Sequence, residues 1–182
     1  MIDLSLLKNF FPIEGERITL SVFREENITE AYLGWLNDPV VVRFSDQRFR
    51  KHTQQTSLNY LNSFIDTENF FFAIYLKDDK RYVGTMSVYF SSAHETADIG
   101  IMIGNKACWR QGIASDAWIT LLSFLLDMVK VRKITGGTLS GNTAMINIMI
   151  NSGMELDGVR VAQELVDGQV QDVMHFAKFR GD

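Results

Sequence analysis

Residues 101–118 read IMIGNKACWRQGIASDAW, and the fold and the function both depend on this stretch. An apolar, strand-like run ends at Gly104, and a polar loop leads from there into a long apolar helix. Three side chains of the loop suit an anion: Lys106, Arg110 and Gln111. Three small residues open the helix: Gly112, Ala114 and Ser115. The first N–H groups of a helix lack partners within it, and glycine lets a ligand approach the backbone closely. The stretch therefore predicts a site for a phosphate or pyrophosphate group.

The composition indicates a globular protein and narrows its partners. The chain has 182 residues, of which 46% are hydrophobic and 12% aromatic, and this predicts a single domain over residues 1–182. The net charge of −4 argues against a broad nucleic-acid-binding surface. Cys108 is the lone cysteine, and no apolar run reaches the roughly 20 residues of a membrane helix. We therefore expect a cytoplasmic protein with no nucleic-acid partner and no membrane partner.

Hydrophobic periodicity and turn residues predict the order of strands and helices. Strands are expected over residues 17–23, 70–76, 82–90, 97–103, 133–139, 154–166 and 170–179. Helices are expected over residues 28–36, 53–65, 113–129 and 142–151. Short turns between the three middle strands predict an antiparallel meander, and Asp167–Gly168 is a strong hairpin signal. The fold class is therefore α/β with a mixed sheet.

Two common nucleotide-binding patterns are missing from the sequence. The chain has no Gly-x-x-x-x-Gly-Lys-Ser/Thr segment, which excludes the triphosphate P-loop. It has no Gly-x-Gly-x-x-Gly segment after an early strand, which excludes the dinucleotide-binding arrangement. The three histidines lack the spacing of metal ligands, and no metal is expected. The predicted anion site therefore belongs to another class of ligand.

Residues 109–115, WRQGIAS, resemble the acyl-CoA pyrophosphate loop of the GNAT N-acetyltransferases, Gln/Arg-x-x-Gly-x-Gly/Ala. Trp109 replaces the first Gln or Arg, which is similar to the RimJ/RimL-type branch that includes the ribosomal-protein-alanine acetyltransferases. Other segments resemble that branch in the same order: WLNDP at 35–39, GNTA at 141–144, Gly153–Met154, Asp157–Gly158 and DGQVQD at 167–172. The resemblance covers nearly the whole chain. It implies a mixed, mostly antiparallel twisted sheet of about seven strands flanked by about four helices.

The resemblance implies an acetyl-CoA-dependent enzyme that transfers the acetyl group directly to a primary amine. Acetyl-CoA (coenzyme A) would be a co-substrate, and the acceptor would be a protein N-terminus or a small molecule. The strand at 101–104 would separate from the next strand, so that its backbone can pair with the pantetheine. The residues implied in cofactor binding are Ile101, Met102, Ile103, Trp109, Arg110, Gln111, Gly112, Ile113, Ala114, Ser115, Asn142 and Asn147.

The acceptor amine must lose a proton, and the resemblance implies a carboxylate for this step. Asp98 is the candidate general base and Glu95 the second choice, although Asp98 also suits an ordinary strand-edge position. Asn142 resembles the asparagine that contacts the cofactor near its sulfur, and it would also serve as a helix N-cap. Many relatives carry a proton-donating tyrosine where this chain has Met149. Either Asn142 or Ser140 would then stabilise the thiolate, or CoA would leave as the anion.

Two other functions remain open from the sequence alone. One is an amino-sugar or nucleotide-sugar N-acetyltransferase of surface-polysaccharide synthesis, whose anionic acceptor would suit RFSDQR at residues 43–48. The other is a non-catalytic acyl-CoA-binding sensor with the same fold. Acceptor contacts are expected from residues 43–52 and from the strand around residues 89–94. A homodimer through the paired strands of the tail is a further alternative.

Overall fold

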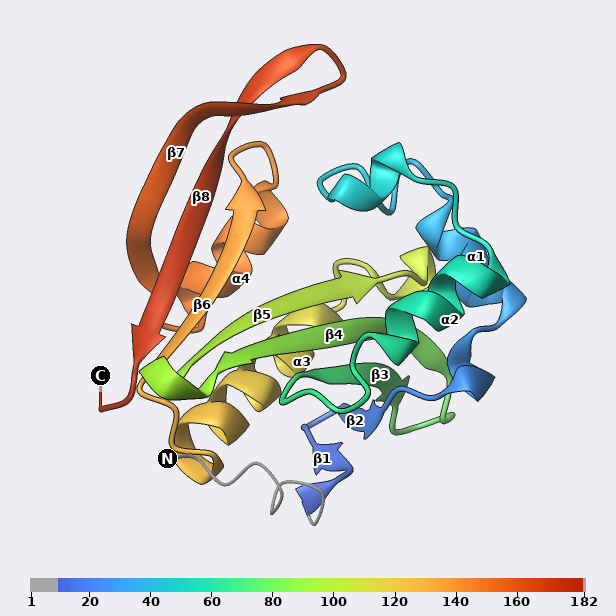
Figure 1. Ribbon diagram of the computed structural model, residues 1–182, viewed down its shortest axis with the longest axis horizontal. Coiled ribbons are helices and arrows are strands. Elements are labelled where there is room, and N and C mark those ends of the chain that lie inside the picture. The colour runs from blue at the N-terminus through green and yellow to red at the C-terminus, as the bar shows by residue number, and fades with distance from the viewer. Residues whose placement is uncertain (1–9, 182) are drawn as a thin grey trace.

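The computed structural model describes residues 10–181, and its centre is a twisted sheet of eight strands (Figure 1). The strands lie in the order β1-β2-β3-β4-β5-β6-β8-β7, and β5–β6 is the parallel pair. They are β1 (Ile13–Glu14), β2 (Ile18–Val22), β3 (Phe70–Leu76), β4 (Tyr82–Ser91), β5 (Thr96–Ile103), β6 (Lys133–Leu139), β7 (Glu155–Val166) and β8 (Gln169–Phe179). The α-helices of the described residues are α1 (Glu30–Leu36), α2 (Gln54–Asn62), α3 (Ile113–Ser123) and α4 (Thr143–Asn151). Within this described part, none of the helices has the length and apolar character needed to cross a membrane.

The helices cover the two faces of the sheet in pairs. α3 and α4 pack over the larger core on one face, and α1 and α2 pack over the smaller core on the other. The sequence of β3, FFFAIYL, shows why both faces are apolar. Phe72 and Ile74 enter the larger core, whereas Phe71 and Ala73 enter the smaller one. Successive side chains of a strand point to opposite faces, so a strand covered on both sides needs a continuous apolar run.

β5 and β6 are paired over only three residues each. Their register runs from Thr96 opposite Lys133 to Asp98 opposite Thr135, and the strands separate beyond that point. Figure 1 shows them side by side where they begin and apart where they end. On its other side β5 stays paired with β4 from Thr96 to Ile103. The predicted separation of this strand from the next one is confirmed.

The predicted elements are confirmed, with differences at short or irregular segments. The sheet has eight strands rather than about seven, because the two-residue strand β1 is too short to show a periodic pattern. The helix predicted over 113–129 is α-helical only to Ser123 and continues as a π-helical segment over Phe124–Met128. The hairpin signal is confirmed, since Asp167 and Gly168 have φ angles of 51° and 79°. Two positive φ angles in succession are what a type I′ turn requires.

An aromatic side chain holds the first helix against the end of β5. Trp35 of α1 lies so close to Gly104 that a Cβ on this glycine would come within 2.1 Å of the indole ring. The indole also packs against Tyr82, with ring centroids 5.0 Å apart. The WLNDP segment therefore joins the α1–α2 layer to the loop that precedes α3.

We expect Gly104→Ala to lower the free energy of unfolding by roughly 1–3 kcal/mol, because the added methyl group must displace the Trp35 ring. Gly34→Ala in α1 is the matched control, since a Cβ there meets nothing within 4 Å. It should raise the free energy of unfolding by about 0.5–1 kcal/mol, because alanine favours a helix. Chemical denaturation measures both changes. A Gly104→Ala protein as stable as the unmodified one would contradict the contact with Trp35.

Candidate active site

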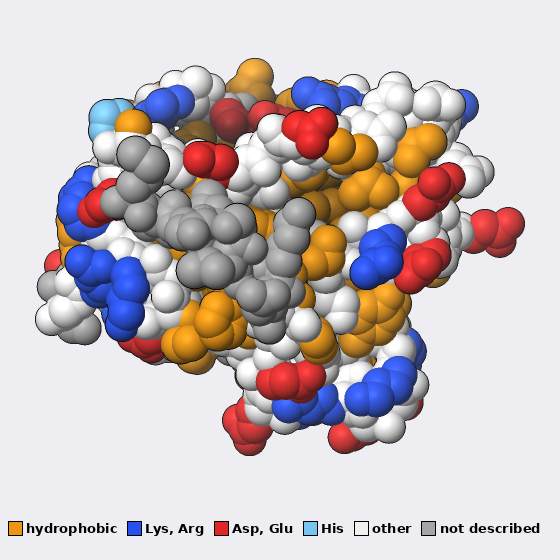
Figure 2. Space-filling view, turned by 60° about the horizontal axis from the view of Figure 1, so that its bottom comes forward, with side chains coloured by type: hydrophobic (Ala, Val, Ile, Leu, Met, Phe, Trp, Pro, Cys, Tyr) orange, Lys and Arg blue, Asp and Glu red, His pale blue; other side chains and the backbone are white. Residues whose placement is uncertain are grey.

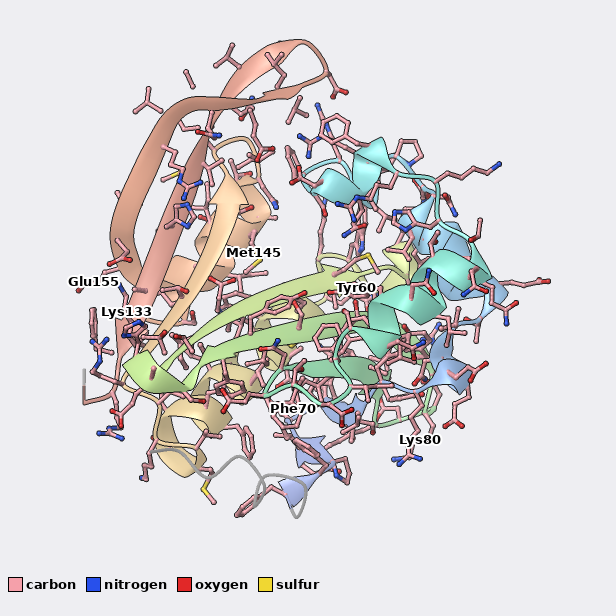
Figure 3. All side chains as sticks on the ribbon, in the orientation of Figure 1. Tyr60, Phe70, Lys80, Lys133, Met145 and Glu155 are labelled. Atoms are coloured by element: carbon pink, nitrogen blue, oxygen red, sulfur yellow. The ribbon has the colours of Figure 1, made fainter. Side chains whose placement is uncertain are left out.

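A large cavity opens where β5 and β6 separate. Its volume is about 1070 Å³, just above the roughly 300–1,000 Å³ typical of a pocket for one small ligand. The loop before α3 and the start of α4 form one side, and α1, α2 and residues 40–52 form the other. Met145 of α4 and Tyr60 of α2, both labelled in Figure 3, line it from these two sides. Residues of β4 and β5 form its floor.

The loop before α3 presents free backbone donors to the cavity. Arg110 and Gly112 have positive φ angles, 59° and 80°, and this conformation turns the chain into the helix. In the described residues, the first N–H of α3 to reach a carbonyl is that of Asp116, which donates to Gly112 O at 2.9 Å. The three N–H groups before it are free to bind an anion. The cavity is lined here by Trp109, Arg110, Gly112, Ile113, Ala114 and Ser115.

Gln111 and Lys106 do not line the cavity, because other parts of the protein hold them. The side-chain amide of Gln111 donates to Ala107 O at 2.6 Å. Lys106 forms an ion pair of 2.6 Å with Asp38, and its hydrogen bond lowers the pKa of the Asp38 carboxyl. Arg110 is therefore the cation that this loop brings to the cavity.

A second cation beside the loop, Arg17, was not found by sequence reasoning. Its guanidinium donates to Gln111 O at 2.5 Å, and its backbone N–H donates to Asp116 Oδ2 at 2.7 Å. Asp116 also accepts from the N–H of Glu16 at 3.1 Å, so its carboxylate fixes the β1–β2 turn to the start of α3. No local signal reveals this contact, because 94 residues separate Arg17 from Gln111.

The strand and helix residues expected near the cofactor lie on the cavity wall. They are Ile101, Met102, Ile103, Asn142 and Asn147. Asn142 caps α4, because its Oδ1 accepts from the N–H of Met145 at 3.3 Å. Its Nδ2 donates to Thr138 Oγ1 at 3.0 Å. The predicted capping role is confirmed, and these two hydrogen bonds fix the Asn142 amide at the edge of the cavity.

Two positions considered for the leaving thiolate do not line the cavity. Met149 has no exposed surface and belongs to the larger core. Ser140 faces β8, where its hydroxyl donates to Gln171 Oε1 at 3.0 Å and accepts from the N–H of Asp172 at 3.2 Å. Of the groups considered for this role, Asn142 is the one that the fold brings to the cavity.

Asp98 lies beside the large cavity, on the sheet face that α2 covers. The register places Ser87 opposite Gly100 and Tyr89 opposite Asp98, and directly opposed residues share a face. Ser87 and Gly100 line the large cavity, whereas Gly100 and Asp98 line an adjoining recess of about 300 Å³. Asp98 Oδ2 accepts a hydrogen bond from Thr135 Oγ1 at 2.6 Å. Gly100 therefore belongs to both spaces and connects Asp98 with the large cavity.

The surroundings of Asp98 raise the pKa of its carboxyl above the ordinary value. Although the carboxyl still reaches solvent, burial in the recess raises its pKa, and the hydrogen bond from Thr135 and the charge of His175 only partly oppose this. His175 of β8 lines the same recess, and its Nδ1 lies 3.2 Å from where a Cβ on Gly137 would be. Because Gly137 has no Cβ, the imidazole of His175 can lie close to its backbone. Glu95, the second candidate base, lines neither space.

Comparisons with known proteins show the family to which this chain belongs. The family model described as "Acetyltransferase (GNAT) domain" matches residues 17–155. The chain belongs to the GNAT acetyltransferase family. It is 24% identical over 107 residues to the probable N-acetyltransferase YjcK of Bacillus subtilis (strain 168). That match spans 58% of this chain and 59% of the relative, so it covers less than two thirds of either protein.

Solved structures share the GNAT fold almost from end to end. The spermidine N-acetyltransferase from Vibrio cholerae, in complex with CoA and spermine, has a TM-score of 0.79 over 90% of this chain and 96% of that one, at 15% identity. RimL, a ribosomal L7/L12 alpha-N-protein acetyltransferase in complex with CoA, has a TM-score of 0.79 over 92% and 96%, at 16% identity. The predicted mixed, mostly antiparallel GNAT fold is confirmed. At these identities the likeness shows the fold alone.

In this GNAT protein the segment over residues 43–52, expected at the acceptor, contacts two different parts of the structure. Two of its arginines turn to the β7–β8 hairpin, where Arg43 pairs with Asp167 at 3.0 Å and Arg48 with Glu164 at 2.9 Å. Other residues of the segment line the cavity: Phe44, Ser45, Gln47, Arg50, Lys51 and His52. The expected acceptor region is thus only partly at the cavity.

The other expected acceptor region, residues 89–94, is connected to the cavity by a hydrogen bond to Tyr60. The hydroxyl of Tyr89 hydrogen-bonds that of Tyr60 at 2.7 Å, and Tyr60 lines the cavity. Burial raises the pKa of Tyr60, and the hydrogen bond to Tyr89 adds to this effect. Residues 89–94 themselves line neither space.

The end of α1 determines where the 40–52 loop returns to the cavity. Asn37 Oδ1 accepts from the N–H of His52 at 2.9 Å, and Asn37 Nδ2 donates to His52 O at 2.8 Å. The same Nδ2 donates to Leu33 O at 2.8 Å within the helix. One side chain of the WLNDP segment therefore attaches a cavity-lining peptide to α1.

We expect Asn37→Ala to lower the free energy of unfolding by about 1–3 kcal/mol, because it leaves both backbone groups of His52 without their partner. Hydrogen exchange of the His52 amide should accelerate more than that of the sheet. Asn62→Ala is the control, since Asn62 is exposed and its side chain has no hydrogen bond among residues 10–181. Unchanged exchange at His52 would show that Asn37 does not hold the loop.

Proposed function

We propose that this GNAT protein transfers the acetyl group of acetyl-CoA directly to the nitrogen of a primary amine. The proposal rests on the separation of β5 and β6 beyond Asp98, beside a loop that turns free N–H groups to the same cavity. An open strand edge can pair with an extended ligand, and a helix start can bind a pyrophosphate. The CoA in the complexes of the two solved relatives supports CoA as the donor.

The donor would lie along the wall that runs from α3 to β6. Its pyrophosphate would accept hydrogen bonds from the N–H groups of residues 113–115, and Arg110 would add charge. Its pantetheine would pair with the backbone of residues 101–103, while Asn142 and Asn147 face it from the other side. The indole N–H of Trp109 donates to Ile103 O at 2.8 Å and so couples the loop to the end of this strand.

The reaction needs a neutral amine and an activated thioester. The amine nitrogen attacks the carbonyl carbon, the C–N bond forms, and the C–S bond then breaks and releases CoA as the thiolate. Asp98 would accept the proton that the amine loses, directly or through a water. A free N–H of β5 would stabilise the negative charge on the carbonyl oxygen. Because a thiol pKa is about 8.5, release of the thiolate costs little near neutral pH, and no acid at Met149 is needed.

We assign the protein to the RimJ/RimL-type branch because of its WRQGIAS and GNTA segments, with a protein N-terminus or a small molecule as acceptor. We also propose a cytoplasmic location, which suits the free, buried thiol of Cys108.

An amino sugar or nucleotide sugar is the second candidate acceptor. A non-catalytic CoA sensor would share the donor site. Thiol release from acetyl-CoA with a panel of amines separates enzyme from sensor, because a sensor binds CoA without turnover on any amine.

We expect Gly112→Val to weaken CoA binding about tenfold or more, because the side chain blocks the approach of the pyrophosphate to the backbone. Gly168→Val is the matched control, since Gly112 and Gly168 have φ angles of 80° and 79°. Both variants should lose about 1–2 kcal/mol of stability from the same backbone strain. Isothermal titration with CoA distinguishes them. Equal CoA affinity in the two variants would exclude the loop as the pyrophosphate site.

We expect Asp98→Asn to reduce kcat by roughly 10²–10⁴-fold while the affinity for acetyl-CoA stays unchanged. The base works when deprotonated, so the rate should fall as the pH drops through the pKa of Asp98. Because burial raises this pKa above its ordinary 3.8, the acid limb of the kcat/KM profile should lie above pH 3.8. The variant should lack this limb. If Asp98→Asn keeps the profile and Glu95→Gln removes the limb, the base is Glu95.

A further inference from the structure

Two cations on the cavity wall have no part in the donor site, and we propose that they bind an anionic group of the acceptor. Arg50 and Lys51 line the large cavity, and neither forms an ion pair within residues 10–181. The acceptor is then a primary amine that also carries a carboxylate or a phosphate. This inference rests on the proposed acetyl transfer and specifies its substrate class.

The charge of the cavity wall is opposite to that of the chain. The chain has 22 Asp and Glu against 18 Lys and Arg, and on the outer face in Figure 2 both kinds are interspersed. Among the described residues that line the cavity there is no Asp or Glu, whereas Arg50, Lys51 and Arg110 are present. A concave wall of one sign attracts ligands of the other sign. Because Arg110 belongs to the pyrophosphate loop, two cations remain for the acceptor.

The position of these two cations in the chain places them on the acceptor side. The peptide of His52, which follows Arg50 and Lys51, is held by Asn37 at the end of α1. α2 begins directly after this point and covers the sheet face that carries Asp98. The donor loop lies at the other wall of the cavity, at the start of α3. An anion held by Arg50 and Lys51 would therefore belong to the molecule that approaches Asp98.

The arginines earlier in the same loop are already neutralised. Arg43 pairs with Asp167, and Arg48 pairs with Glu164 at 2.9 Å and with Asp46 at 3.6 Å. The side chain of Arg48 is only 13% exposed. The arginines of segment 43–48, a segment that would suit an anionic acceptor by its sequence, thus have their partners within the chain. Arg50 and Lys51, which form no ion pair among the described residues, follow shortly after this segment.

A buried hydroxyl on the same side has no partner in the described chain. Ser57 of α2 is 4% exposed and lines the cavity, and its Oγ makes no hydrogen bond there. Buried polar groups are nearly always paired with protein, water or ligand. The hydroxyl of Ser57 is therefore available to a polar group of the acceptor, close in sequence to the two cations.

A polycationic acceptor such as spermidine finds no matching charge in this cavity. The carboxylates that line the adjoining recess are Asp46, Asp98 and Glu164. Arg48 neutralises two of them, and burial raises the pKa of the third. The solved relative from Vibrio cholerae contains spermine, but the charges here favour the opposite class of amine.

Matched pairs of amines test the proposal by thiol release from acetyl-CoA. Suitable pairs are glucosamine with glucosamine 6-phosphate and glycylglycine amide with glycylglycine, with spermidine as the polycation. We expect the anionic member of a pair to have a kcat/KM about tenfold higher or more, because a charge-assisted contact is gained. In Arg50→Gln/Lys51→Gln this preference should disappear, while the KM for acetyl-CoA stays unchanged.

Lys80→Gln/Arg81→Gln is the control, because it removes the same charge at the β3–β4 turn, away from the cavity, where Figure 3 labels Lys80. It should keep the preference for the anionic member. A preference for the neutral amine or for spermidine would overturn the proposal. So would a double variant in which the preference remains and the KM for acetyl-CoA rises, because the two cations would then serve CoA.

A binding measurement separates failure of this inference from failure of the proposed enzyme. With saturating CoA, inorganic phosphate should raise the melting temperature of the unmodified protein but not that of Arg50→Gln/Lys51→Gln, and spermidine should raise neither. This result would support the anion site even if no amine were acetylated. An equal phosphate shift in both proteins, or no shift in either, would overturn it. No turnover together with no CoA binding would overturn the proposed function itself.

Discussion

The structure depends on two parallel strands that part after three paired residues. The separation of β5 from β6 is tolerated because each strand stays hydrogen-bonded to the strand on its other side. β5 is paired with β4 from Thr96 to Ile103, and β6 is paired with β8 from Lys133 to Leu139. An open strand edge usually invites unwanted pairing with other chains. Here the edge lies inside a cavity with helices and loops on both sides, so that it is accessible to a ligand of the right shape.

The same crossover that connects these strands also provides the proposed anion site. Parallel neighbours need a long connection, and here it consists of the 104–112 loop, α3 and the π-helical segment. α3 must therefore begin where β5 ends, at the open end of the gap. Trp35 over Gly104 and the carboxylate of Asp116 on the β1–β2 turn hold this corner from two directions. The gap between β5 and β6 and the free N–H groups at the start of α3 therefore both follow from the crossover connection between these strands.

Local signals predicted most of the fold, and contacts between distant segments account for what was missed. Asn142 is the helix cap that the sequence predicts, and Asp167 and Gly168 form the expected turn. Pairings such as Arg17 with Gln111 and Arg48 with Glu164 join segments that share no local pattern. For this reason the cations of the 43–48 segment looked available in the sequence and are occupied in the fold. The roles of the cofactor-binding residues and of Asp98 stay predictions.

The position of Gly100 connects the donor, the acceptor and the proposed base. It lies on β5 between the stretch that would pair with pantetheine and the residue that would take the proton, and it lines both the cavity and the recess. A Cβ there would come within 3.0 Å of Ser87 Oγ and would occupy the face on which the amine must arrive. Asp98 lines the recess and not the large cavity, so it would supply a carboxylate to the proposed reaction without an acidic wall that would repel an anionic acceptor. Separation of the proposed base from the binding cavity would thus allow one site to attract a negative substrate and still deprotonate its amine.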